Sequence, residues 1–190
     1  MRIFWAVMFL TVSLFGVDKL MYAKDDTELL SDDKKPLGTV NFASPLIFIK
    51  QNGELSKVAL NGWIADGSED VMYIKEGVIL EVASINEEGA KIYKKIGEKD
   101  DEYGNKWLNI SIEGWVKSSE LENSVQEDMK ALNTLYTQRC SACHAPHDIS
   151  HFDANVWPAM MDAMADRAGI SPSEKYKILR YLQFETLNNH

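Results

Sequence analysis

The feature that most constrains this chain is a five-residue run near its C-terminus, Cys140-Ser141-Ala142-Cys143-His144. Two cysteines three positions apart lie on one side of a helical turn, so both sulfurs can reach one edge of a flat macrocycle. A C-x-x-C-H run is typical of haem attachment, in which both thiols bond the haem and the imidazole ligates its iron. The chain has two cysteines, and this run contains both. The sequence therefore predicts one covalently bound haem c.

Two other readings of the same cysteines stay open at this point. A redox dithiol is typically found beside a βαβ pattern, and no such pattern surrounds this run. A structural zinc ion takes four nitrogen or sulfur ligands. Cys140, Cys143 and two of the three nearby histidines, His144, His147 and His151, would supply them.

The N-terminus has the pattern of an export signal. Arg2 provides a basic start, and an apolar run follows from Ile3 to Val17. Met21-Tyr22-Ala23 offers a cleavage site after Ala23, with an uncleaved membrane anchor as the alternative. Because c-type haem is attached outside the cytoplasmic membrane, the signal and the motif together predict a periplasmic protein. The net charge of −9 argues against nucleic acid as a partner.

Between the signal and the haem motif the composition changes twice. Residues 24–38 are polar and charged and predict a linker. Residues 39–123 contain short β-type runs separated by turn residues, which predicts a small barrel or sandwich. This segment has no histidine or cysteine and therefore no evident catalytic centre. The predicted domains are thus a signal at 1–23, a linker at 24–38, a β domain at 39–123 and a haem domain at 124–190.

The tryptophans of the β segment have a recognisable setting. Lys106-Trp107-Leu108 and Gly114-Trp115-Val116 give residues 39–123 a resemblance to bacterial SH3-like domains, and Gly62-Trp63 repeats the Gly-Trp pair. Such tryptophans can line a groove for a peptide or glycan. They can equally fill or border a small β core, and we favour this second interpretation.

From Ser124 onward the apolar residues recur at helical spacing. Met129, Leu132 and Tyr136 lie on one stripe of a helix that leads into Cys140. Asn155 can cap a second helix, and Ser171-Pro172-Ser173-Glu174 is a capping box that opens a third. The predicted fold class is therefore β + α: a small SH3-like β barrel followed by a three-helix, class I-like cytochrome c domain.

The iron needs a second axial ligand besides His144. The second predicted helix contains Met160, Met161 and Met164, and a thioether ligand would raise the haem potential. We expect Met164 to be this ligand because it shares a helical face with Trp157 at i, i+7. Met161, Met160 and His151 are the alternatives, and His151 would give a lower-potential haem with two histidine ligands.

The C-terminal part resembles the C-terminal monohaem domain of the pentahaem c-type cytochrome of trimethylamine N-oxide respiration. The resemblance rests on Arg139-Cys140-Ser141-Ala142-Cys143-His144, Ala154-Asn155-Val156-Trp157-Pro158, Met164 and Ile178-Leu179-Arg180-Tyr181-Leu182-Gln183. It implies thioether bonds at Cys140 and Cys143, a proximal ligand at His144 and a distal ligand at Met164. It also implies that the domain passes electrons to a periplasmic molybdenum reductase, with an upstream membrane quinol-oxidising cytochrome as the donor.

Two functions from different classes follow from these features. The leading hypothesis is a monohaem electron carrier, not an enzyme, that donates electrons to a trimethylamine N-oxide or dimethyl sulfoxide reductase in anaerobic respiration. A carrier needs a docking face and no proton-handling residues, which agrees with the lack of an acid–base pair. The alternative is a periplasmic haem-based sensor or ligand-binding module that uses the SH3-like segment.

Overall fold

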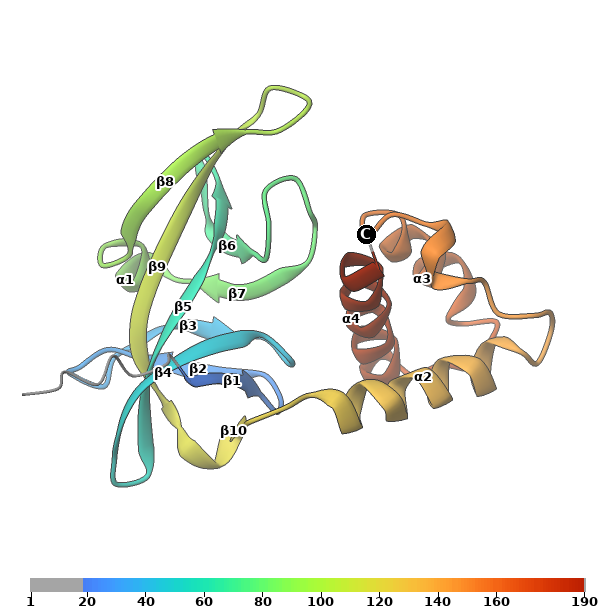
Figure 1. Cartoon of the computed structure of the whole chain (residues 1–190), viewed down its shortest axis with the longest axis horizontal. Helices are drawn as coiled ribbons and strands as arrows, with labels where there is room; N and C mark the ends of the chain where they lie inside the picture. The colour runs from blue at the N-terminus through green and yellow to red at the C-terminus, as the bar shows by residue number, and fades with distance from the viewer. Residues whose placement is uncertain (1–18, 190) are drawn as a thin grey trace, which may run out of the picture.

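The computed structural model describes residues 19–189, which form a β part followed by a helical part (Figure 1). The helices are α1 (Glu87–Ala90), α2 (Gln126–Cys140), α3 (Trp157–Met164) and α4 (Pro172–Asn189), with 3-10 turns η1 (Ser118–Glu120) and η2 (Ile149–His151). The strands are β1 (Lys19–Ala23), β2 (Thr27–Leu30), β3 (Pro36–Val40), β4 (Pro45–Asn52), β5 (Leu55–Ala65), β6 (Ser68–Tyr73), β7 (Glu81–Ile85), β8 (Lys94–Asp100), β9 (Lys106–Lys117) and β10 (Leu121–Glu122).

Six strands close into a barrel. Their order around the ring is β5-β6-β7-β3-β2-β9, and the antiparallel pairing of β9 with β5 closes it. That pairing runs from Leu55 opposite Lys117 to Ala65 opposite Trp107. On the outer side of β5 the sheet continues through β4, β1 and β10, and β8 pairs with β9 at the other edge.

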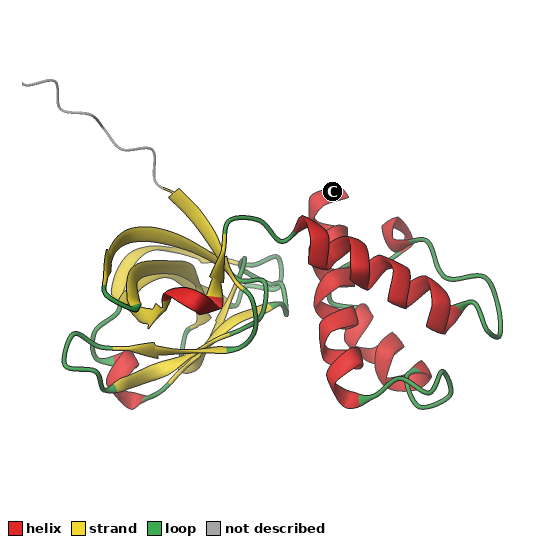
Figure 2. Ribbon diagram, turned by 90° about the horizontal axis from the view of Figure 1, so that it is seen from below, coloured by secondary structure: helices red, strands yellow, loops and turns green. Residues whose placement is uncertain are grey.

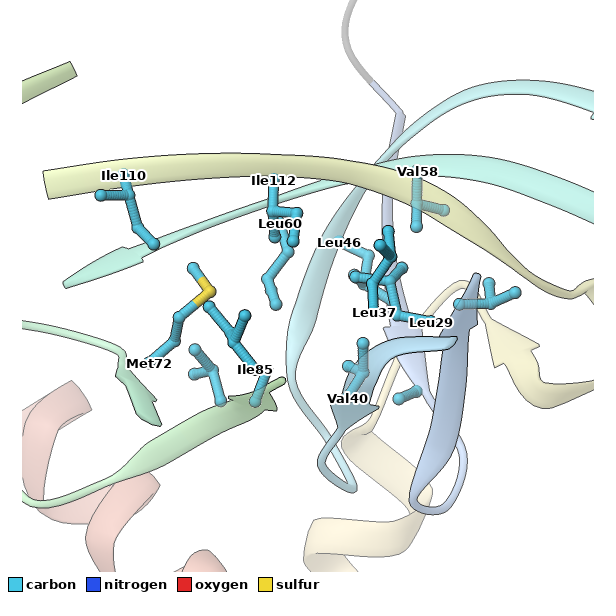
Figure 3. Close-up of a cluster of buried hydrophobic side chains, with 14 of the residues drawn as sticks. Leu29, Leu37, Val40, Leu46, Val58, Leu60, Met72, Ile85, Ile110 and Ile112 are labelled. Atoms are coloured by element: carbon cyan, nitrogen blue, oxygen red, sulfur yellow. The ribbon is translucent and has the colours of Figure 1, made fainter. Parts of the chain in front are cut away.

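The barrel core follows from the alternation of side chains along the two longest strands. In β5 the inward residues Val58, Leu60 and Ile64 are fully buried. On the paired strand β9, Ile110 and Ile112 point into the same core beside Leu60 (Figure 3). Successive side chains of a strand point to opposite faces, so every second residue enters the core. The buried set is completed by Ala23, Leu29, Leu37, Val40, Leu46, Met72, Val82, Ala83, Ile85, Val116 and Leu121.

The predicted fold class is wrong. The described chain is mostly β, with a closed six-stranded barrel instead of a small SH3-like one, and its four helices do not form a three-helix class I cytochrome c fold. One reason is that α1 belongs to the β part and that α3 has only 8 residues. Another is that the helices do not enclose a core of their own, because residues from the β part complete it.

The segment 24–38, for which the sequence predicts a linker, contains β2 and the start of β3. Both strands belong to the closed ring, and their inward side chains Leu29 and Leu37 are each 2% exposed. The charged residues of this segment that suggested a linker, such as Asp32 and Lys34, lie on the outside or in the β2–β3 turn. The polar composition of residues 24–38 therefore reflects two strands that have one face exposed to solvent.

The helical part packs directly on the barrel (Figure 2). Its buried cluster contains Phe42 and Ala43, which come from the turn between β3 and β4. The Arg180 guanidinium on α4 is 3% exposed and donates hydrogen bonds to the carbonyl oxygens of Phe42 and Glu81 and to Ser44 Oγ. Because a buried cation needs partners for its N–H groups, these bonds fix α4 against the barrel.

Three further observations concern the surface and the ends. Trp107 is 8% exposed and donates from Nε1 to Asp101, while Trp115 lies on the outer face and donates to Asp32. The tryptophans therefore border the barrel separately.

Within residues 19–189 no helix is both long enough and apolar enough to cross a membrane. The apolar run Ile3–Val17 of the predicted signal lies outside the described residues.

Candidate functional site

The haem motif begins on the last residue of α2. Cys140 is half-buried, and Ser141, Ala142, Cys143 and His144 follow it in a turn that is exposed to solvent. Helix α2 is fixed by its buried side chains Leu132 and Tyr136, and the Arg139 guanidinium pairs with Glu174 at the start of α4. Cys140 therefore lies at the C-terminal end of a helix that is anchored by packing and by an ion pair. Cys143 and His144 lie on the exposed turn that follows.

Helix α3 faces this turn across a small apolar pocket. The pocket is lined by three methionines of α3, by Cys140 and His144 of the motif, and by four more residues: Met160, Met161, Met164, Cys140, His144, Tyr136, His147, Trp157 and Ile170. Thiol, imidazole and thioether groups thus meet in one place, although Met164 lies 24 positions after Cys140 in the chain. These are the soft and nitrogen ligands that iron in a haem accepts.

The imidazole of His144 has a defined orientation. Its Nδ1 lies 2.7 Å from the carbonyl oxygen of Ala145. Because a carbonyl oxygen can only accept a hydrogen bond, this contact assigns the proton of the neutral ring to Nδ1. The Nε2 atom is then left with a free lone pair, as a metal ligand requires.

Aromatic rings close the other sides of the pocket. Trp157 is 1% exposed and lies edge-on to Tyr136 and Phe152, with ring centroids 6.4 and 5.2 Å apart. The hydroxyl of Tyr136 donates to the carbonyl oxygen of His147, and burial raises the pKa of Tyr136 to about 12. Burial also raises the pKa of the Cys140 thiol. Both groups are therefore neutral at pH 7, as an apolar pocket favours.

The structure brings together most of the predicted site residues. Met160, Met161 and Met164 all line the pocket with Cys140 and His144. Two predicted residues are not part of its lining: Cys143 is exposed on the turn, and His151 is exposed on η2.

Three lining residues were not predicted as part of a site: Tyr136, Trp157, which served only to define the helical face of Met164, and Ile170. Tyr136 belonged to an apolar helical stripe, and its position four residues before Cys140 places it one helical turn behind the motif. That spacing is the signal by which it could have been found. Ile170 lies just before the third predicted helix and carries no such signal.

The zinc reading finds no support in the described part of the chain. Within residues 19–189 no three or more histidine, cysteine, aspartate or glutamate side chains are grouped so that they could hold a metal ion. The rings of His144 and His147 lie 5.4 Å apart, but His147 packs on Phe152, at 5.3 Å. The two cysteines are not joined in a disulfide.

The residues fit a haem by their chemistry. The pocket has an apolar and aromatic lining, the imidazoles of His144 and His147, and three thioethers on α3. Its volume is about 20 Å³, which is room for about one water molecule. Binding of a macrocycle would therefore require a wider space between α3 and the turn that carries His144.

A ligand set of this kind, two thiols three residues apart followed by an imidazole, defines the class of c-type cytochromes. Comparison with known proteins agrees with this class. The family described as "TorC third cytochrome c domain" matches residues 15–121, more than half of the chain, and this chain belongs to that family. The matched residues form the barrel and lie outside the C-x-x-C-H run.

Curated relatives match over longer stretches. The chain is 32% identical over 151 residues, or 78% of its length, to the cytochrome c-type protein TorY of Escherichia coli O157:H7. It is 26% identical over 176 residues, or 90% of its length, to the cytochrome c-type protein TorC of Escherichia coli K12. A match of 90% cannot leave out residues 140–144, which lie well inside the chain.

These matches confirm the coarser part of the resemblance, a c-type cytochrome of the TorC and TorY kind, for which haem c is the cofactor. The chain spans about 40% of the length of these relatives. No solved structure matches the chain.

Proposed function

We propose that this chain is a periplasmic monohaem electron carrier that donates electrons to a molybdenum-dependent trimethylamine N-oxide or dimethyl sulfoxide reductase. The observation that carries the proposal is the pocket between α2 and α3, where the C-x-x-C-H run faces three methionine thioethers. Membership of the TorC family supports a role as a c-type cytochrome. The resemblance of residues 139–183 to the C-terminal domain of such a cytochrome is the basis for proposing the reductase as the partner.

Four residues in and beside the pocket would hold the haem in this proposal. Cys140 and Cys143 would bond the haem, His144 would ligate its iron through Nε2, and Met164 would supply the second protein ligand. The haem supplies a one-electron couple, and a thioether ligand places its potential above that of a haem with two histidines. The apolar lining would limit access of water to the iron, which would favour transfer of an electron over chemistry on a bound substrate.

The proposal needs no acid–base group near the iron. The Tyr136 hydroxyl in the pocket lining is neutral because burial raises its pKa to about 12, and it donates a hydrogen bond to the carbonyl oxygen of His147. The Tyr136 hydroxyl therefore does not exchange its proton around neutral pH. Electron transfer requires only that the haem edge approach a partner, and Cys143 and His144 lie on the exposed side.

The test combines the reduced protein with its acceptor. Reduced haem protein is mixed with a trimethylamine N-oxide reductase from the same source, and haem absorbance is followed after addition of trimethylamine N-oxide. We expect rapid haem oxidation with the reductase and none without it. Oxidation by the substrate alone, or no oxidation with an active reductase, would contradict the carrier.

A matched pair of variants controls the haem attachment. Cys140→Ala together with Cys143→Ala should leave no haem on the polypeptide after acid–acetone extraction and a denaturing gel. Ser141→Ala, which changes a residue between the two cysteines, should keep the haem stain. Stain that survives in the double variant would refute covalent attachment.

A further inference from the structure

Strand β1 is an internal strand of the sheet. It lies between β4 and β10, with Leu20 opposite Ile47 and Met21 opposite Leu46 on one side, and with Tyr22 opposite Glu122 on the other. A strand with partners on both edges has its backbone N–H and C=O groups engaged in two ladders. This strand covers residues 19–23, the last residues of the leader that the sequence predicts to be removed.

The side chains of β1 serve both parts of the molecule. Ala23 is fully buried in the barrel core, and Met21 packs against that core from the same face of the strand. Tyr22 points the other way and lines a groove of about 430 Å³ with Val125 and Met129 of the helical part. Because successive side chains of a strand point to opposite faces, one face of β1 packs on the barrel core and the other lies beside α2.

The backbone around Ala23 is anchored as well. The N–H of Ala23 donates to Ser44 O at 3.2 Å, its carbonyl oxygen accepts from the N–H of Ala43 at 2.8 Å, and the next N–H, of Lys24, donates to Glu120 O at 2.9 Å. Cleavage of the bond between Ala23 and Lys24 during export would remove all the ladder bonds of β1 before folding. It would also leave the Ala43 N–H and the Ser44 carbonyl without these partners.

Loss of β1 would also release the connection to the haem-binding part. Among the described strands, β10 pairs only with β1, and β10 leads through Asn123 and Ser124 into α2. Without β1, β4 would become an edge strand, and Leu46 and Leu121, now 0% and 4% exposed, would lose an apolar neighbour. The match to the cytochrome family gives independent support, because it begins at residue 15 and so includes the whole of β1.

We propose that Met21-Tyr22-Ala23 is not a leader-peptidase site and that β1 stays in the mature protein as the strand that joins the barrel to the helical part. The N-terminus of the exported protein is then at or before Lys19. The apolar run Ile3–Val17 is either cut upstream of Lys19 or retained as a membrane anchor, and β1 follows it after a single residue, Asp18. This proposal does not depend on the identity of the electron acceptor.

The first measurement maps the N-terminus. The chain is expressed from Met1 in a Gram-negative host, the haem-stained product is purified from the periplasmic and membrane fractions, and its N-terminus is determined by sequencing and intact mass. An N-terminus at or before Lys19, in either fraction, supports the proposal. An N-terminus at Lys24 overturns it.

The second measurement tests the strand itself with two versions of the chain behind one unrelated cleavable leader. The version that starts at Asp18 should fold. The version that starts at Lys24 should fail to accumulate or should melt about 10 °C or more below it, because it lacks a doubly paired strand. Equal melting temperatures, by far-ultraviolet circular dichroism, would overturn the proposal. Haem staining of both versions separates a failure of haem attachment from a failure of the strand.

Discussion

Three methionine side chains of α3 line the same pocket as Cys140 and His144. Met161 is 4% exposed and belongs to the buried cluster of the helical part, so packing accounts for it without a ligand role. Met160 and Met164 are half-buried and lie four residues apart, on the same face of α3. Met164 is the last residue of the helix, where its side chain has the most freedom to reach an iron.

We predict that replacement of Met164 changes the haem and replacement of Met161 does not. Met164→His should keep a low-spin haem and lower its midpoint potential, because an imidazole favours oxidised iron more than a thioether does; axial ligands set haem potentials over roughly 0.8 V. Met161→Leu is the control and should leave the potential nearly unchanged. Spectroelectrochemical titration measures both. A larger shift for Met161→Leu would reassign the ligand.

Glu174 links two helices at one carboxylate. It accepts hydrogen bonds from the N–H of Ser171 at 2.9 Å and from Arg139 at 2.7 Å, and Ser171 Oγ in turn accepts from the N–H of Glu174. The capping box that the sequence predicts is thereby extended to Arg139, the residue before Cys140. These hydrogen bonds, the one from Ser171 first, lower the pKa of Glu174 from 4.5 to about 2.

We therefore predict an acid-side loss of stability that depends on Glu174. Because the folded-state pKa lies below the ordinary one, the carboxylate stabilises the fold above about pH 4.5, and this contribution is lost as the pH falls towards 2. Glu174→Gln should be less stable than the parent at pH 7, and the difference should shrink between pH 4.5 and 2. Urea unfolding at a series of pH values measures it.

The control for this series is Glu54→Gln, which removes one negative charge from an exposed turn. A difference between the Glu174→Gln variant and the parent that stays constant across this pH range would show that the carboxylate is not held by these hydrogen bonds.

At the scale of single elements, one glycine allows the barrel to close. A Cβ atom at Gly114 of β9 would lie 2.6 Å from Leu29 Cδ1 and 2.9 Å from the carbonyl oxygen of Leu30. This is where β2 pairs with β9, through Leu30 opposite Trp115. A glycine in a strand interior often marks such a close approach of two backbones.

We predict that Gly114→Ala destabilises the protein by about 1–3 kcal/mol, because the added methyl group overpacks the contact between β2 and β9. Gly97→Ala is the matched control: it adds the same group to the edge strand β8, where the nearest atom, Asn109 Cβ, lies 4.0 Å away. Its free energy of unfolding should change by no more than about 0.5 kcal/mol. Chemical denaturation distinguishes the two, and equal effects would contradict this account of the closure.

At the scale of the whole molecule, α4 joins the barrel to the haem-binding part. Besides Arg180, Gln183 on this helix donates to the carbonyl oxygens of Ile79 and Ala154, and Tyr176 donates to Asp26. Asn155, which precedes α3, is bonded to the N–H of Ile79 and to the carbonyl of Gly77. The pocket between α2 and α3 is thus held in a fixed place relative to the barrel.

We predict that Arg180→Met costs roughly 2–3 kcal/mol and separates the unfolding of the two parts, because it leaves the carbonyl oxygens of Phe42 and Glu81 without their donor. The parent should unfold in one transition and the variant in two, followed by circular dichroism and by haem absorbance. Arg167→Met, at an exposed arginine after α3, is the control and should behave like the parent. A single unshifted transition in Arg180→Met would refute this role.

The sequence by itself determined the local features of this protein. Cys140, Cys143 and His144 form one helical turn and its continuation, and the capping box at Ser171 and Glu174 needs only neighbouring residues, so short-range geometry is enough to predict them. The alternating apolar residues of β5 and β9 likewise predict strands, because the side-chain period of a strand is local.

Only the tertiary structure decided how these pieces close. Residues 24–38 carry enough charge to suggest a linker, yet Leu29 and Leu37 complete a closed ring, because a strand with one solvated face needs few buried side chains. Phe42 completes the core of helices that lie far along the chain, and Arg180 can be buried because distant carbonyl oxygens accept hydrogen bonds from its guanidinium. The predicted fold class was wrong because it omitted these contacts. Pairing between residues far apart in the chain produces no periodic pattern in the sequence from which it could be predicted.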